Sequence, residues 1–185
     1  MLMRPASLFA ALFLCAPVLA AAPAKPPRPA LLSDHDLGKT CAAPVFRQFD
    51  FWLGRWHVTN PAGVTVGHSR ITRISRGCAI REQWFGRKST GNSLNYYDAG
   101  TKQWHQDWVG SGGQVLHLHG RLQGASMVLT GTRKDKRGHV RDRITWTPLN
   151  SGRVRQHWEI SRDGGTSWKT IFLGTYTRAT TNGTL

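Results

Sequence analysis

Acidic residues are scarce in this sequence. Aspartate and glutamate together number 10 of 185 residues, against 25 lysines and arginines, so the formal net charge is +15. A basic surface favours polyanions such as nucleic acid, anionic lipid head groups or lipopolysaccharide. The arginines are scattered singly and no dense basic run is present, so we expect no specific nucleic-acid contact. An anionic envelope surface is a partner that this charge suits, and the alternative is simply a solvated outer face of a sheet.

Long hydrophobic runs are scarce too. The apolar run Leu8–Leu19 is too short to span a bilayer, which takes about 20 apolar residues. Arg4 precedes it, and Val18 and Ala20 fit the small-residue pattern before a signal peptidase cut after Ala20. Residues 1–20 therefore predict a signal peptide. The protein is expected to be exported, periplasmic or secreted, with no transmembrane segment in the mature chain; a retained membrane anchor is the alternative.

The stretch after the predicted cut has the composition of a linker. It opens with AAPAKPPRPA, and alanine and proline at that density cannot build a core. We interpret residues 21–44 as an Ala/Pro-rich linker. Residues 45–178 then form one domain, large enough for a single core, and 179–185 form a C-terminal tail.

No helix of ordinary length is visible after the linker, and short alternating segments recur instead. Clusters of Gly, Asn, Asp and Pro, such as NPAG, KDKRG and RDGGTS, separate these segments and supply tight turns. The pattern predicts about ten strands, at Trp52–Asn60, Val64–Ser75, Cys78–Phe85, Ser93–Asp98, Gln103–Val109, Gln114–Gly120, Ser126–Arg133, His139–Thr147, Arg153–Ser161 and Trp168–Arg178. Because the connections are short, we expect an all-β fold, an antiparallel up-and-down β-barrel of about ten strands, with an open sandwich as the alternative.

Alternation within these strands separates a charged face from an apolar face, and the charge-rich face must lie outside. The inner face is rich in tryptophan and carries Glu82, Gln106 and Gln156. Ligand pockets are mostly apolar with a few convergent polar groups. The mixture suits a small ring-bearing or amphiphilic molecule, and the candidate ligand-binding residues are Glu82, Trp84, Asn95, Trp104, Gln106, Trp108, Trp146, Gln156 and Trp158. The alternative is that these side chains fill the barrel and satisfy one another.

The segment FDFWLGRWHV, at residues 49–58, resembles the start of a lipocalin-like barrel of the calycin superfamily. Those barrels open their first strand with Gly-x-Trp, here Gly54 and Trp56, and an arginine of the last strand packs across the tryptophan. Arg178 ends the last predicted strand in the matching place, and cation–π stacking gives the pair a physical rationale. Most of the mature chain also resembles a family of bacterial secreted proteins with a calycin-type barrel, which brings no established activity.

Metal and cofactor chemistry have little support. His117 and His119 lie at i and i+2 on one strand face, but a zinc site needs a third ligand, with His105 or Asp107 as candidates. No spacing fixes that ligand, and the histidines alternate with leucines, so we interpret them as a wet face and predict no metal site. Haem-binding calycins use an axial histidine near the C-terminal strands. The last histidine here, His157, falls on the outer face, so no cofactor is expected.

The segment Ser161–Trp168 fits the Asp-box pattern S-x-D-x-G-x-[ST]-W. In this hairpin motif the aspartate bonds N–H groups of its own turn and the tryptophan packs beneath. The motif is best known from the repeated blades of sialidase-type propellers, and one copy cannot make a propeller. We predict a self-capped hairpin turn, with a glycosidase as the alternative.

Cysteine is the third scarce residue type. Cleavage after residue 20 would leave only Cys41 and Cys78, and export delivers the chain to an oxidising compartment. We predict a disulfide between them, which would tie the end of the linker to the third strand. Two unpaired thiols are the alternative.

Signatures of catalysis are missing. There is no G-x-S-x-G, no H-E-x-x-H and no cysteine in a catalytic setting. Glu82 is the single carboxylate on an apolar face, and burial can raise a carboxylate pKa, but a general acid would want a second titratable partner, and none is apparent. We predict an exported, non-enzymatic barrel that binds a small molecule inside. The alternatives are a hydrolase or isomerase-type enzyme using Glu82 or a histidine-bound metal, and an envelope interaction module using the basic exterior.

Overall fold

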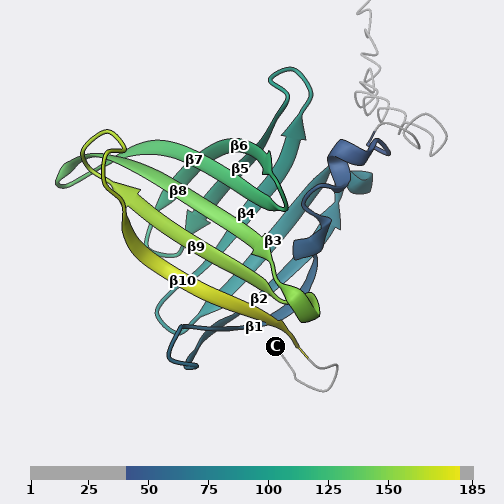
Figure 1. Ribbon diagram of the computed structural model, residues 1–185, viewed down its shortest axis with the longest axis horizontal. Helices are drawn as coiled ribbons and strands as arrows, with labels where there is room; N and C mark the ends of the chain where they lie inside the picture. The colour runs from purple at the N-terminus through teal and green to yellow at the C-terminus, as the bar shows by residue number, and fades with distance from the viewer. Residues whose placement is uncertain (1–40, 180–185) are drawn as a thin grey trace, which may run out of the picture. The chain divides into compact units, whose positions relative to one another are not determined.

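The computed structural model describes residues 41–179, and these form one closed barrel of ten antiparallel strands (Figure 1). Each strand pairs with its neighbour in the chain, and β1 pairs with β10, so the barrel is up-and-down. The predicted fold class is confirmed. The predicted signal peptide, most of the predicted linker and the tail beyond residue 179 lie outside the described residues. Within residues 41–179 no helix is long and apolar enough to cross a membrane.

The strands lie close to the predicted segments. Their bounds are β1 Gly54–Thr59, β2 Thr65–Ile74, β3 Ala79–Gly86, β4 Thr90–Asp98, β5 Gln103–Gly110, β6 Val115–Gln123, β7 Ser126–Asp135, β8 Gly138–Pro148, β9 Val154–Ser161 and β10 Lys169–Arg178. Short 3₁₀ turns accompany them at η1 Pro44–Arg47, η2 Asp50–Trp52, η3 Ser75–Gly77 and η4 Asn150–Gly152.

Most predicted strand bounds differ from the observed ones by one to three residues; β4, for example, begins at Thr90 and not at Ser93. Trp52 lies in η2, and β1 begins at Gly54, because the chain before β1 turns into the barrel instead of extending along its wall. Cys78 has helical backbone angles at the end of η3, so β3 begins at Ala79.

The period-2 pattern of the sequence appears directly as burial. In β3, Ile80 and Glu82 are buried whereas Arg81 and Phe85 are exposed, and β2, β4 and β8 alternate in the same way. The inner face therefore collects most of the tryptophans and a set of buried polar side chains, and the arginines lie mainly outside.

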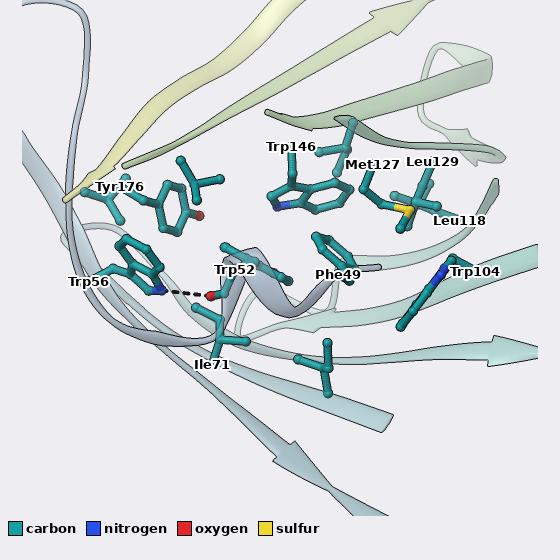
Figure 2. Close-up of a cluster of buried hydrophobic side chains, with 14 of the residues drawn as sticks. Phe49, Trp52, Trp56, Ile71, Trp104, Leu118, Met127, Leu129, Trp146 and Tyr176 are labelled. Atoms are coloured by element: carbon teal, nitrogen blue, oxygen red, sulfur yellow. Dashed lines mark hydrogen bonds between the residues drawn. The ribbon is translucent and has the colours of Figure 1, made fainter. Parts of the chain in front are cut away.

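One end of the barrel is packed shut by the chain that precedes β1. Phe49 and Trp52, from the η1–η2 segment, are completely buried and stack with ring centroids 5.0 Å apart. Phe49 meets the rings of Trp104 at 5.7 Å and Trp146 at 5.2 Å, and Trp52 lies 6.3 Å from Tyr176 (Figure 2). Aliphatic side chains from other strands complete this core, so the closed end is solid.

The contact expected among Gly54, Trp56 and Arg178 is present at the closed end. The Arg178 guanidinium lies 4.1 Å from the centre of the Trp56 ring and donates a 2.6 Å hydrogen bond to the carbonyl of Leu53. Gly54 has φ of +139°, and a Cβ there would lie 2.0 Å from Arg178 Nη1, so only glycine fits. The Trp56 indole donates to the carbonyl of Trp52 at 2.9 Å, which links the stack to η2 (Figure 2).

The expected disulfide is present as well. Cys41 and Cys78 are bonded, with their Cα atoms 5.0 Å apart. The bond anchors the start of the described chain beside β3, and it closes a loop with a sequence separation of 37 residues. Cross-links over loops of this length stabilise folded domains by about 4 kcal/mol in the chain-entropy account.

Candidate functional site

The other end of the barrel contains a cavity of about 780 Å³. Residues of the β1–β2, β3–β4 and β5–β6 connections surround its mouth, and Glu82, only 4 % exposed, lies at its floor. The cavity is lined by Asn60, Val64, Val66, Glu82, Trp84, Gly86, Arg87, Lys88, Ser89, Trp108, Gln114, Gln156, Trp158, Ile171, Phe172 and Tyr176.

Glycines on neighbouring strands explain why this end is hollow although large rings line it. A Cβ on Gly67 of β2 would lie 2.7 Å from the Trp84 ring, and a Cβ on Gly91 of β4 would lie 2.3 Å from the Trp108 ring. Each indole therefore lies against the bare backbone of the adjacent strand. Rings held along the wall leave the centre of the barrel open, which larger residues at Gly67 and Gly91 would prevent.

The walls of the cavity are aromatic. Trp84 and Phe172 meet edge to face with centroids 6.0 Å apart. Trp158 is held by its indole N–H, which donates a 2.8 Å hydrogen bond to Asp142 Oδ1. Asp142 is 1 % exposed and also accepts from Arg133 Nε at 2.8 Å, so this buried carboxylate has a cationic partner. Asp142 was not among the predicted residues, although it has the same strand parity as Ile144 and Trp146 on β8.

The floor of the cavity is a carboxylate without a cation. Glu82 accepts hydrogen bonds from Ser69 Oγ at 3.2 Å and Ser93 Oγ at 2.9 Å, and both serines are buried. Burial raises the pKa of Glu82 to about 7, because desolvation outweighs the opposing effect of the two serine hydrogen bonds. Glu82 is therefore divided between its neutral and charged forms near neutral pH.

Behind the floor, buried amides form a hydrogen-bonded network. Gln106 Nε2 donates to Asn95 Oδ1 at 2.8 Å, and Asn95 Nδ2 donates to Ser93 Oγ at 2.9 Å. Asn95 also donates to the carbonyl of Ile80 at 3.3 Å. These contacts satisfy the amides within the wall and orient Ser93 toward Glu82.

Tyr176 adds a second titratable group to the floor. Its hydroxyl donates to Oε1 of Gln156, and both side chains line the cavity. Burial holds the pKa of Tyr176 well above its usual value, and the nearby charge of Glu82 raises it further. Tyr176 was not predicted, although it has the same strand parity as Phe172 and Gly174 on the inner face of β10.

The mouth of the cavity is basic. Arg87 and Lys88, in the β3–β4 connection, are exposed. The other titratable side chains of the lining are Glu82 and Tyr176, at the floor. No carboxylate within residues 41–179 forms an ion pair with either of them. They are therefore available to an anionic group at the cavity mouth.

The predicted ligand-binding residues form two groups, according to their position along the barrel axis. Glu82, Trp84, Trp108, Gln156 and Trp158 line the cavity. The other four lie below it: the wall network contains Asn95 and Gln106, and the plugged end contains Trp104 and Trp146. Trp104 donates its indole N–H to Gln48 of the plug at 3.1 Å, which fixes it there.

The outer histidines do not gather into a metal site. His117 Nδ1 lies 2.6 Å from Asp107 Oδ1, and the rings of His105 and His119 are 6.1 Å apart. Across residues 41–179 no group of three or more His, Cys, Asp or Glu side chains is placed to hold a metal ion. His157 contacts Thr170 Oγ1 at 2.7 Å on the outer face, as strand parity predicts.

The Asp-box segment is a self-bonded hairpin turn between β9 and β10. Asp163 accepts from the backbone N–H of Ser167 at 2.9 Å and from the hydroxyl of Ser161 at 2.7 Å. Trp168 donates to the carbonyl of Gly165 at 3.0 Å and packs under the guanidinium of Arg143, whose distance to the ring centre is 4.0 Å. The turn lies outside the cavity lining, in keeping with a structural role.

No known protein family and no curated protein sequence matches this chain. The class of protein therefore rests on its architecture. An antiparallel up-and-down barrel of ten strands, plugged at one end and hollow at the other, is consistent with a calycin-like fold.

Proposed function

We propose that this protein is an exported, lipocalin-like barrel that binds a small ring-bearing or amphiphilic ligand in its cavity without transforming it. The observation that carries the proposal is the cavity of about 780 Å³, whose walls are aromatic and whose polar groups converge at the floor. Small-molecule sites are commonly concave, mainly apolar and equipped with a few polar groups that orient the ligand.

The contrast between the two ends of the barrel supports a binding role. At the closed end the chain fills the interior with Phe49, Trp52 and aliphatic side chains. At the open end it keeps Gly67 and Gly91 beneath the rings, which leaves the interior empty. A barrel shaped only for stability gains more from burying apolar side chains at both ends, because close packing and apolar burial are its main stabilising terms.

Export is proposed on two further grounds. The apolar run and small residues at the N-terminus are typical of a cleaved signal peptide. The Cys41–Cys78 disulfide is compatible with an oxidising compartment such as the periplasm or the extracellular space.

The test is a titration of the mature protein with 1-anilinonaphthalene-8-sulfonate, a ring-bearing fluorescent anion, followed by energy transfer from the cavity tryptophans. We expect saturable binding with one site per chain. The variant Val66→Phe adds a ring to the cavity lining and should weaken binding at least about tenfold. Val115→Phe adds the same ring to an exposed outer position, at 42 % exposure, and should leave binding unchanged. Equal binding by both variants would place the dye outside the cavity and contradict the proposal.

Acid–base chemistry on the bound molecule is a second candidate function, favoured by one observation. Glu82 titrates near neutral pH and Tyr176 supplies a second titratable group beside it, which the sequence did not reveal. A Tyr176→Phe variant separates the two functions. Pure binding survives loss of the phenol hydroxyl, whereas turnover of any bound compound that depends on a proton donor at the floor does not.

A further inference from the structure

Two buried carboxylates of the same barrel differ in their partners. Asp142, 1 % exposed, is paired with Arg133 at 2.8 Å. Glu82, 4 % exposed, is hydrogen-bonded only to Ser69 and Ser93, and no arginine, lysine or histidine within residues 41–179 forms an ion pair with it. Buried carboxylates are normally paired with a cation or kept neutral, since desolvating an isolated charge is expensive. Glu82 therefore lacks a cationic partner of the kind that Arg133 provides for Asp142.

The groups that surround Glu82 do not provide that partner. On β3 its neighbours Arg81 and Gln83 have the opposite strand parity and point away from the interior. The adjacent strands β2 and β4 present the two serines, and across the barrel β9 and β10 present Gln156 and Tyr176. Among the described residues that line the cavity, Tyr176 is the titratable group that faces Glu82, and it stays neutral at physiological pH. The remaining ionic groups of the lining, Arg87 and Lys88, are at the mouth.

The side chains above Glu82 are suited to a cation. Trp84, Trp108, Trp158 and Phe172 line the cavity, and aromatic faces attract ammonium groups, most strongly where water is excluded. A carboxylate at the base of several aromatic rings offers both attractions to one charge. The exposed Arg87 and Lys88 disfavour a simple cation at the mouth and favour a molecule that also carries an anionic group.

We propose that the cavity binds a zwitterion whose substituted ammonium group lies among the aromatic rings at Glu82 and whose anionic group lies at Arg87 and Lys88. This inference rests on the proposed function, because it assigns a ligand class to the same cavity. The bound ammonium group supplies the counter-ion that the fold withholds from Glu82. The apolar part of the ligand lies in the cavity between Glu82 and the mouth, against the aromatic side chains.

Three matched probes test this assignment by isothermal titration calorimetry. They are 6-(trimethylammonio)hexanoate, its methyl ester, which is a cation, and 7,7-dimethyloctanoate, in which carbon replaces the ammonium nitrogen. We expect the zwitterion to bind at least about tenfold more tightly than its carbon isostere, the range that cation–π and charge attraction supply in desolvated sites. The methyl ester should also bind more weakly than the zwitterion, since it loses the attraction of the mouth.

Substitutions assign each end of the ligand separately. Glu82→Gln should weaken the zwitterion about tenfold or more while leaving the carbon isostere unchanged, because the amide keeps the shape and removes the charge. Replacing Arg87 and Lys88 together by Gln should weaken the zwitterion and strengthen the methyl ester. Near-ultraviolet circular dichroism of each variant checks that the fold is retained, and equal affinity of the Glu82→Gln variant for the zwitterion would overturn the assignment.

The pH dependence provides an independent readout. A quaternary ammonium does not titrate, and the probe carboxylate is already ionised above about pH 6. Zwitterion affinity should therefore rise about tenfold from pH 6 to pH 8 as Glu82 loses its proton, and Glu82→Gln should remove that rise. Binding of the anilinonaphthalene dye with no preference for the zwitterion would overturn the ammonium assignment and leave the proposed function intact. Failure of the dye and all three probes to bind would overturn both.

Discussion

The indole ring of Trp108 lies so close over Gly91 that a Cβ on this glycine would approach the ring to 2.3 Å. The two residues belong to adjacent strands, β5 and β4, and the absent side chain of one makes room for the ring of the other. The same relationship joins Trp84 and Gly67. Large aromatic side chains can thus line a barrel without filling it.

Gly91→Ala tests this relationship. The new methyl group must displace the Trp108 ring toward the centre of the barrel, and overpacking of this kind costs about 1–3 kcal/mol of unfolding free energy. We expect lower stability in urea and weaker dye binding. Gly112→Ala is the control, because no atom lies within 4 Å of a Cβ at that loop position. Equal behaviour of the two variants would show that the ring does not depend on the bare backbone at Gly91.

The raised pKa of Glu82 makes stability depend on pH. The folded-state pKa of about 7 exceeds the ordinary value of 4.5, so folding favours the neutral form. The contribution of this group is fully present below pH 4.5 and is lost as pH rises through 7, about 3 kcal/mol in all. Urea unfolding of wild type and Glu82→Gln between pH 4.5 and 8.5 measures it. The difference should move in favour of the variant as pH rises, and parallel curves would contradict the raised pKa.

Arg178 should contribute to stability through two contacts at the closed end. Arg178→Gln removes the stack on Trp56 and weakens the hydrogen bond to the Leu53 carbonyl, so we expect a loss of about 1–2 kcal/mol. Arg155→Gln is a matched control, since Arg155 is exposed on β9. Thermal unfolding of both variants decides the matter, and an equal, small effect at the two positions would remove the energetic role assigned to the stack.

The disulfide should contribute more to the free energy of unfolding than the two contacts of Arg178 do. Replacing Cys41 and Cys78 together by serine opens the 37-residue loop and should lower the unfolding free energy by about 4 kcal/mol. A reductant should lower the melting temperature of the wild-type domain toward that of the double variant and have no effect on the variant itself. A wild-type melting temperature that is insensitive to complete reduction would contradict this assignment.

The number of strands, the closure of the barrel and the inward or outward direction of side chains could be predicted, because the spacing of turns and the alternation of residues indicate them. Alternation with period 2 places Glu82, Trp84 and Trp158 inside whatever the rest of the chain does. The same rule places Asp142 and Tyr176 inside, and these two could have been found from parity alone. Among the predicted ligand-binding residues, β8 contributed only Trp146 and β10 contributed none.

The position of a residue along the barrel axis could not be predicted from that pattern. Trp104 and Trp108 share one face of β5, yet one packs against the plug and the other lines the cavity. The difference depends on strand register and on Phe49 and Trp52, which precede β1. The sequence assigned Phe49 only to the domain of residues 45–178, and it placed Trp52 at the start of the first predicted strand. Contacts between segments far apart in the sequence decide which end of the barrel is filled.

A high-resolution crystal structure of the mature protein grown with the anilinonaphthalene dye tests the central claim most directly. The account predicts one dye molecule inside the barrel, enclosed by Trp84, Trp108 and Trp158, with its sulfonate toward Arg87 and its rings above Glu82. A barrel in which Trp84 and Trp108 turn inward to fill the interior, with the dye absent or on the outer surface, would contradict it.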